Sequence, residues 1–304
     1  MSPPPHSRLS GFAFADTPLD RADHLRDDAG ALAGLWPSAR VLAIDGEGNA
    51  LADADGRALA PTGAQLGGGP GTAIFLGLRE GEAWFAVRAE TLAFDAPARI
   101  DLRRAAATWP AFESGLFALA RALLHWHART RHCGACGGAV QFRRAGYLGY
   151  CTQCAAEHYP RVDPAVIVAV SDGERLLLGR QASWPARRYS LVAGFVEPGE
   201  TLEQTVAREV FEETRVRVTA SRYLAAQPWP FPGALMLGFE ADAHPDAPQV
   251  DGELEDARWF GVDEIGAALQ RRADDGGDGL LLSPRISIAR SLIEHWHRQR
   301  AHGG

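Results

Sequence analysis

Three glutamates that fall within about one helical turn are the residues best placed to do chemistry. Glu209, Glu212 and Glu213 lie in the stretch Arg208–Glu213. In a helix, Glu209 and Glu213 share one face and Glu212 lies beside them. Like charges at this spacing destabilise a helix, and Arg208 alone cannot neutralise them. A divalent cation would neutralise these carboxylates. Ligands that are all oxygen favour Mg²⁺ or Mn²⁺.

Such a metal site predicts a phosphate ester or anhydride as substrate. A hard cation completes its coordination with phosphate oxygens and lowers the pKa of a bound water, while a nearby glutamate accepts the proton. The expected reaction is therefore hydrolysis. The alternative is that Glu203, Glu209, Glu212 and Glu213 form the solvated face of a surface helix.

The four cysteines have the spacing of a metal site. Cys133 and Cys136 form one Cys-x2-Cys pair, and Cys151 and Cys154 form a second pair after a 14-residue spacer. Two such turns place four thiolates around a zinc ion and leave no open position for catalysis, so the zinc is expected to be structural. The alternatives are two disulfides, which are rare in cytoplasmic proteins, or four unrelated thiols in a core.

The hairpin between the cysteine pairs leaves two roles open. It carries Phe142, Arg143, Arg144 and Tyr147, which could contact nucleic acid. It could instead join two domains, and the acidic chain favours this second role. The net charge of −7 argues against bulk electrostatic binding of nucleic acid, so any RNA contact should be local.

Hydrophobicity predicts a protein with no membrane span, because no apolar stretch approaches the roughly 20 residues that a bilayer requires. Residues 1–6 lack a basic start followed by an apolar run, so no secretory signal is expected. These features predict a cytoplasmic location.

Apolar periodicity and turn residues predict four parts of an α+β protein. The strands expected in the first part are 39–44, 72–78 and 83–87, and later strands are expected at 165–170, 175–179, 191–195 and 234–241. Helices are expected at 109–131, 201–214 and about 286–300. The expected division is an N-terminal β-rich domain (1–108), a linking helix (109–131), a zinc ribbon (132–160) and a hydrolase domain (161–304).

The glutamates belong to a longer pattern that resembles the Nudix box. Gly194, five residues, Glu200, seven residues and then Arg208–Glu213 and Val216 match this signature of Nudix hydrolases. The resemblance implies an α/β/α sandwich in which the three glutamates bind Mg²⁺ or Mn²⁺ and Arg208 holds a glutamate in place. One position departs, because Arg215 stands where the box has glycine, the residue that best adopts a left-handed helix end.

Two further features resemble the NADH pyrophosphatase branch of this family. The segment 227–236 is similar to its SQPWPFPxS motif, although Ala226 and Ala234 replace the two serines. The branch also carries a four-cysteine zinc ribbon before its Nudix domain and a connector like Tyr159-Pro160-Arg161. The resemblance covers about residues 109–300.

The resemblance also implies a set of site residues. Glu253 and the main-chain carbonyl of Ala193 would complete the metal shell, with Glu240 and Glu255 as competitors for the role of Glu253. Phe195 would stack on a base of the dinucleotide. The residues expected to line the substrate pocket with it are Tyr159, Gln227, Pro228, Trp229, Pro230, Phe231, Pro232, Gly233, Ala234 and Ala289.

The function implied is cleavage of the pyrophosphate of NAD(H) into nicotinamide mononucleotide and AMP, and removal of NAD caps from RNA 5′ ends. The loss of both serines keeps a second enzyme open, an ADP-ribose or general nucleoside-diphosphate hydrolase. A third possibility is a nucleotide-sensing regulator whose zinc ribbon contacts nucleic acid. The branch is generally dimeric, so a homodimer is expected.

Overall fold

The computed structural model describes residues 9–93, 96–272 and 275–301, and the chain divides into two compact units. Unit 1 comprises Met1–Ala15, Asp163–Pro228 and Ala234–Gly304, and unit 2 comprises Asp16–Val162 and Trp229–Gly233. The segment at residues 1–6, which bears on the expected absence of a signal, lies outside the described residues. Within the described parts of the chain, no helix is long and apolar enough to cross a bilayer.

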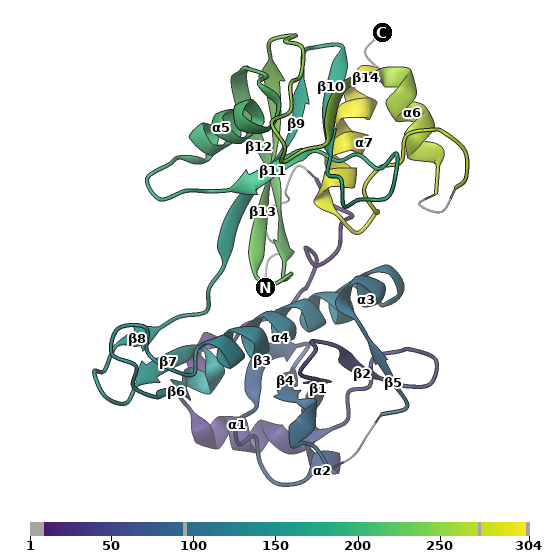
Figure 1. Cartoon of the computed structure of the whole chain (residues 1–304). Helices are drawn as coiled ribbons and strands as arrows, with labels where there is room; N and C mark the ends of the chain where they lie inside the picture. The colour runs from purple at the N-terminus through teal and green to yellow at the C-terminus, as the bar shows by residue number, and fades with distance from the viewer. Residues whose placement is uncertain (1–8, 94–95, 273–274, 302–304) are drawn as a thin grey trace. The chain divides into compact units, whose positions relative to one another are not determined.

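Unit 2 is built on a five-stranded sheet in the order β3-β4-β1-β2-β5, in which only β1 and β4 run parallel (Figure 1). Helix α4 packs on β1, β3 and β4 through a buried stripe that includes Phe112, Leu116 and Leu123. A small antiparallel sheet, β6-β7-β8, follows α4. The strands are β1 Arg40–Ile44, β2 Ala50–Ala52, β3 Ile74–Arg79, β4 Glu82–Arg88, β5 Ala98–Ile100, β6 Val140–Arg143, β7 Leu148–Cys151 and β8 Glu157–His158, and the helices are α1 Ala29–Leu35, α2 Gly63–Leu66, α3 Leu102–Thr108 and α4 Ala111–Arg129.

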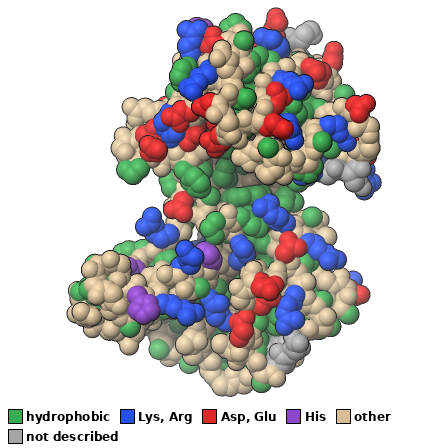
Figure 2. Space-filling model, in the orientation of Figure 1, with side chains coloured by type: hydrophobic (Ala, Val, Ile, Leu, Met, Phe, Trp, Pro, Cys, Tyr) green, Lys and Arg blue, Asp and Glu red, His purple; other side chains and the backbone are tan. Residues whose placement is uncertain are grey.

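Unit 1 is an α/β/α sandwich around a sheet ordered β12-β13-β9-β10-β14, with β11 paired to β9. Helix α5 contacts β9 and β11, while α7 contacts β9 and β13 from the other apolar core. Figure 2 shows acidic side chains gathered over α5. The strands are β9 Asp163–Ser171, β10 Arg175–Arg180, β11 Val192–Phe195, β12 Val218–Trp229, β13 Ala234–Ala243 and β14 Asp256–Gly261, and the helices are α5 Leu202–Thr214, α6 Val262–Gln270 and α7 Ile288–Ala301.

Strand β9 is buried on both faces and divides its side chains between two cores. Val166, Val168 and Val170 pack with α5 residues, whereas Ile167 and Ala169 pack in the cluster that contains α7. This alternation follows from the two-residue period of a strand. The parallel pairing of β9 with β13 and the antiparallel pairing with β11 place the strand at the centre of the sheet.

The strands and helices expected from periodicity are confirmed to within a few residues. The expected helix at 201–214 is α5, and the expected strand at 165–170 is the inner part of β9. Elements that the sequence did not reveal include β12, β14 and α6. Residues 218–223 of β12 are mostly exposed, so they lack the alternating pattern that identifies a half-buried strand.

Candidate functional site

Helix α5, which carries Arg208 and the three glutamates, begins at a capping box that fixes its first turn. The Thr201 hydroxyl accepts a hydrogen bond from the Gln204 backbone N–H at 3.3 Å, and the Gln204 side chain accepts one from the Thr201 N–H at 2.8 Å. These two bonds satisfy donors that a helix start leaves free. The cap therefore sets which face Arg208 and the glutamates present.

Arg208 is the centre of the polar network on this helix. Its Nε and Nη2 donate to the two carboxylate oxygens of Glu200 at 2.6 and 2.9 Å, and its Nη1 donates to Glu212 at 3.0 Å. Nη1 also lies 3.0 Å from Glu209 Oε1, and Nη2 donates to the Phe195 carbonyl at 3.0 Å. The guanidinium hydrogen bonds lower the pKa of Glu200 to about 2, so Glu200 is ionised and holds Arg208 in place.

Glu209 lies directly over the backbone of strand β11. A Cβ atom added at Gly194 would overlap the Glu209 carboxylate, so only glycine leaves room for this arrangement. Gly194 directly follows Ala193 in β11, and the Ala193 carbonyl was expected to share the metal ion of Glu209. Burial raises the pKa of Glu209, and the neighbouring Arg208 opposes this shift.

Substituting Gly194 by alanine is expected to lower kcat/KM on the order of 10²-fold, because the Glu209 carboxylate must move away from its place over β11. Thermal stability should change little, since the carboxylate can swing toward solvent. Steady-state hydrolysis and a melting curve test both points. Gly34→Ala is the control, because a Cβ there meets no atom within 4 Å. Unchanged activity of the Gly194 variant would contradict the prediction.

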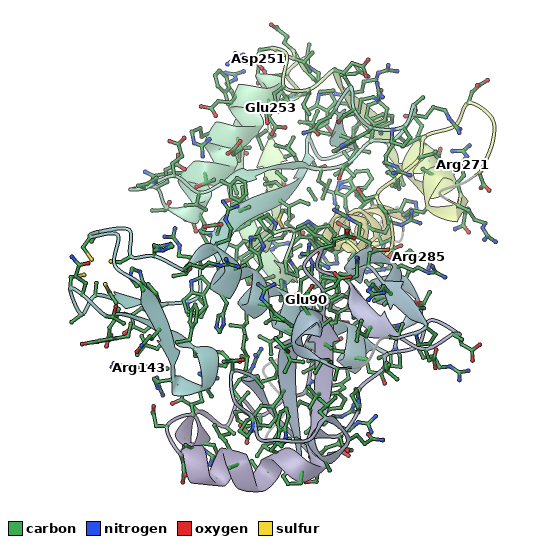
Figure 3. All side chains as sticks on the ribbon, turned by 60° about the horizontal axis from the view of Figure 1, so that its bottom comes forward. Glu90, Arg143, Asp251, Glu253, Arg271 and Arg285 are labelled. Carbon is green, nitrogen blue, oxygen red and sulfur yellow. The ribbon has the colours of Figure 1, made fainter. Side chains whose placement is uncertain are left out.

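Glu213 is the most deeply buried of the three glutamates, with 5% of its surface exposed. Burial, followed by repulsion from Glu253 and then Glu209, raises the pKa of Glu213 to about 8. After burial and the charge of Glu212, the charge of Glu253 also raises the pKa of Glu209, so Glu253 acts on both residues. Figure 3 labels Asp251 and Glu253, which lie toward α5.

The competitors of Glu253 are committed to other partners. Glu255 forms an ion pair with Arg180, and Glu240 forms one with Arg222 and lies 3.6 Å from His295 Nε2. Glu253 is therefore the better candidate for the metal shell. Repulsion between these carboxylates helps to raise the pKa values of Glu209 and Glu213, and a hard divalent cation bound by their oxygens would offset it.

Arg215 occupies the left-handed helix end where the box has glycine. Its φ is 60° and its ψ is 10°, and its backbone N–H donates to the Phe211 carbonyl at 2.8 Å. The guanidinium contacts Asp251 at 2.9 Å and lies 5.5 Å from the centre of the Phe211 ring. Arg215 thus replaces the glycine of the box but keeps the left-handed backbone conformation that glycine would adopt.

Arg215→Gly is expected to raise the free energy of unfolding by about 0.5 to 1 kcal/mol, because glycine adopts this conformation without steric cost. The lost pair with Asp251 offsets only part of this gain, since both side chains are more than 40% exposed. Urea denaturation measures the difference. Asp251→Asn isolates the ion pair, and a lower stability of the glycine variant would show that this pair outweighs the backbone effect.

The expected substrate residues of unit 1 differ in exposure. Phe195 is 59% exposed and free to stack on a ring. Gln227 is fully buried, donates to the Ala13 and Ile286 carbonyls at 2.9 and 2.7 Å, and accepts from the Ile288 N–H at 2.8 Å. Ala289 is 1% exposed within the α7 core. Gln227 thus positions neighbouring backbone and Ala289 packs in the core, while Phe195 is the better candidate for direct contact.

The aromatic residues of the segment Trp229–Gly233 are grouped with unit 2. The Trp229 and Phe231 rings lie 4.9 Å apart, and the Arg103 guanidinium lies 4.2 Å from the centre of the Phe231 ring. Arg121 donates to the Pro230 carbonyl. Tyr159, also expected in the substrate pocket, is 59% exposed and donates to Glu157.

Sequence reasoning missed Arg103 and Arg121 as neighbours of this aromatic segment. They come from α3 and α4, more than 100 residues earlier in the chain, so no motif spacing connects them. The one available signal was the repeat of basic residues at positions 121, 125 and 129 on the expected helix.

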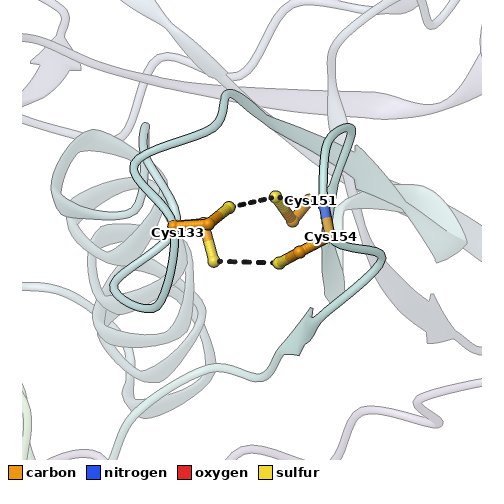
Figure 4. A group of neighbouring side chains, drawn as sticks. Cys133, Cys151 and Cys154 are labelled. Carbon is orange, nitrogen blue, oxygen red and sulfur yellow. Dashed lines mark hydrogen bonds between the residues drawn. The ribbon is translucent and has the colours of Figure 1, made fainter.

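The four cysteine sulfurs lie within 4.8 Å of one another, and among the described residues they form the only group of this kind. The Cys133–Cys154 and Cys136–Cys151 sulfur distances are 3.7 and 3.5 Å (Figure 4). These distances exclude disulfides and match the roughly 3.8 Å between ligands of a tetrahedral zinc with bonds of about 2.3 Å. The cluster therefore fits a structural zinc ion.

The two cysteine turns repeat one geometry. In each, a backbone N–H two residues after the first cysteine donates to its sulfur at 3.4 Å, from Ala135 to Cys133 and from Gln153 to Cys151. These bonds help to lower the pKa of both thiols, which favours the thiolate that binds metal. Gly137 and Ala155 hold the matching left-handed positions, with φ of 76° and 60°.

Comparison with known proteins connects both units to one family. A model described as "NUDIX domain" matches residues 161–279, and one described as "NADH pyrophosphatase-like rudimentary NUDIX domain" matches residues 32–126. The NAD-capped RNA hydrolase NudC of Mycobacterium bovis is 44% identical over 291 residues, which cover 91% of this chain and 92% of that protein. The NAD-capped RNA hydrolase NUDT12 of Homo sapiens is 41% identical over 197 residues, covering 61% of this chain and 42% of that protein. The box helix with its glutamates and the similarity along nearly the whole chain together show that this protein belongs to the Nudix hydrolases, with NADH pyrophosphatase-like domain organisation.

Proposed function

We propose that this hydrolase cleaves the pyrophosphate bond of NAD(H) to nicotinamide mononucleotide and AMP, and removes NAD from the 5′ ends of RNA. The observation that carries the reaction is the set formed by the buried Glu213, the half-buried Glu209 and the exposed Glu253, with the Arg208–Glu200 pair beside Glu209. The substrate class is supported by the NAD-capped RNA hydrolases at 44 and 41% identity.

The carboxylates Glu209, Glu212, Glu213 and Glu253 and the Ala193 carbonyl would hold Mg²⁺ or Mn²⁺. When bound, such an ion neutralises charge on the pyrophosphate oxygens and acidifies a water. Arg208 orients Glu209 and Glu212 through its Nη1, while Glu200 fixes the guanidinium. Water adds to one phosphorus, the bridging P–O bond breaks, the released phosphate oxygen leaves with its mononucleotide, and an ionised glutamate of the set accepts the proton of the water.

Substrate orientation in the proposed reaction depends on ring stacking. The exposed Phe195 side chain offers a flat apolar surface to a nicotinamide or adenine ring. Tyr159 and the segment Trp229–Gly233 are proposed to contact the same dinucleotide. Gln227 and Ala289 would support this arrangement from the core, Gln227 through its bonds to backbone.

The test is product analysis with NADH and with NAD-capped RNA in the presence of Mn²⁺. Release of nicotinamide mononucleotide from both supports the proposal, and its absence from both would refute it. ADP-ribose is the comparison substrate, because Ala226 and Ala234 lack hydroxyl groups that could bind ribose or phosphate. Faster cleavage of ADP-ribose than of NADH would favour the general nucleoside-diphosphate hydrolase.

We also propose that the protein is a cytoplasmic homodimer. The proposal follows from the branch that the chain resembles. Light scattering over a range of protein concentrations tests the oligomeric state, and a constant monomer mass would refute it.

A further inference from the structure

Basic residues are concentrated in one part of this acidic chain. Residues 103–161 contain eight arginines and four histidines against two acidic residues, whereas the whole chain has 31 Lys and Arg against 38 Asp and Glu. This segment includes most of α3, all of α4 and the zinc ribbon. Figure 2 shows blue and purple side chains along α4 and the ribbon.

Helix α4 arranges part of this charge in a row. Arg121, His125 and Arg129 are four residues apart, so they follow one face of the helix at intervals of about 6 Å. His125 and Arg129 are exposed, and Arg121 is half-buried. Burial and then repulsion from Arg121, Arg129 and Arg88 lower the pKa of His125, which agrees with a close group of cations.

Most of this charge is not neutralised by carboxylates. Arg144 forms salt bridges to Asp23 at 3.0 Å and Asp27 at 3.1 Å, whereas the described residues show none for Arg121 or Arg129. Asp45 and Glu47 line a hollow of about 80 Å³ with Arg121 and His125, and Asp101 acts on Arg121 through its charge. Arg129 and Arg131 are exposed and have no carboxylate within 4.0 Å among the described residues.

The row has an aromatic neighbour at each end. Arg121 in the middle of α4 and Arg103 of α3 lie 5.2 and 4.2 Å from the centre of the Phe231 ring, in the segment proposed to contact the dinucleotide. Beyond the end of α4, the exposed Arg143 guanidinium stacks 3.6 Å over the Tyr150 ring of the ribbon. Aromatic and guanidinium planes are surfaces on which unpaired bases stack.

We propose that the row from Arg121 through His125 and Arg129 to the zinc ribbon binds the phosphates of the RNA that follows an NAD cap. The inference rests on the proposed function, because it extends the substrate from the dinucleotide to its attached strand. Free NADH has no RNA strand after its adenosine, so we expect the row to affect capped RNA and not NADH. The locally positive surface explains how a chain of net charge −7 binds a polyanion.

The first experiment measures binding of a short, uncapped single-stranded RNA to the zinc-loaded full chain by fluorescence anisotropy. Arg129→Glu is expected to weaken binding about tenfold at low salt and to make the plot of log affinity against log salt shallower by about 0.7 to 1.4. Arg57→Glu is the matched control, because Arg57 is 79% exposed and outside the row. Arg129→Gln should give a smaller loss in the same direction.

The second experiment measures kcat/KM for NADH and for NAD-capped RNA. Arg129→Glu should lower only the value for capped RNA, and extending the RNA should raise this value in the wild type but less in the variant. Equal RNA binding by wild type and Arg129→Glu, or binding to phosphatidylserine vesicles in place of RNA, would overturn the inference. A wild type that binds RNA through Arg129 but cleaves neither substrate would refute only the proposed function.

Discussion

Glu213→Gln is expected to reduce kcat/KM for NADH by at least about 10³-fold, because it removes a charged ligand from the proposed metal site. The substitution preserves the size of the side chain, so the fold should remain. Mn²⁺ binding, followed by its electron paramagnetic resonance signal, should weaken in parallel. Glu203→Gln is the control, since Glu203 is exposed on the first turn of the same helix.

The same variant should be more stable than wild type when divalent ions are removed. Wild-type Glu213 has a pKa of about 8 in the folded chain against an ordinary 4.5, so the folded state binds the proton more tightly. Stability of the metal-free wild type should therefore fall as pH rises from about 4.5 to 8, by at most about 1.4 kcal/mol per pH unit. The glutamine variant lacks this contribution. Urea unfolding at several pH values tests the difference, and parallel pH profiles would contradict it.

Removing the zinc ion is expected to unfold the ribbon. Structural zinc contributes on the order of 10 kcal/mol to small metal-dependent folds, and this three-stranded sheet has few other buried side chains. Cys151→Ser should lower the zinc content and abolish protection of β6 and β7 from hydrogen exchange. The control is Thr152→Ser, which keeps the hydroxyl that donates to the Ala139 carbonyl at 3.0 Å.

Loss of the ribbon should also distinguish its two possible roles, which are contact with nucleic acid and the joining of two domains. If the ribbon contributes to RNA binding, the Cys151 variant should cleave NAD-capped RNA more poorly relative to NADH. Native hydrogen-exchange protection in the chelated protein would contradict a zinc-dependent fold. Metal analysis of the purified chain gives the stoichiometry directly.

The local structure of the box could be predicted from sequence because its determinants are local. Thr201 and Gln204 cap the helix within one turn, and Arg208 reaches Glu200 eight residues earlier. The cysteine cluster was equally accessible, since two short turns carry all four sulfurs. In both cases spacing along the chain determines distance in space.

The remaining features depend on contacts between distant segments. Nothing in the sequence around Gln227 indicates that its amide is bonded to the Ala13 and Ile286 carbonyls. Arg103 and Arg121 likewise meet Phe231 only through folding. No internal repeat is visible in the sequence, although the model of a rudimentary NUDIX domain matches residues 32–126 and the NUDIX domain model matches residues 161–279.

The burial of both faces of β9 fixes the position of the neighbouring strand β11, which carries part of the proposed metal site. Strand β11 pairs Ala193 with Ile167 and Gly194 with Val166 of β9. A slip of β9 by a single position would exchange the valines that face α5 with the residues that face α7, and both cores would lose their fit. The packing of β9 side chains in two separate cores therefore fixes the position of the β11 backbone, including the Ala193 carbonyl proposed as a metal ligand.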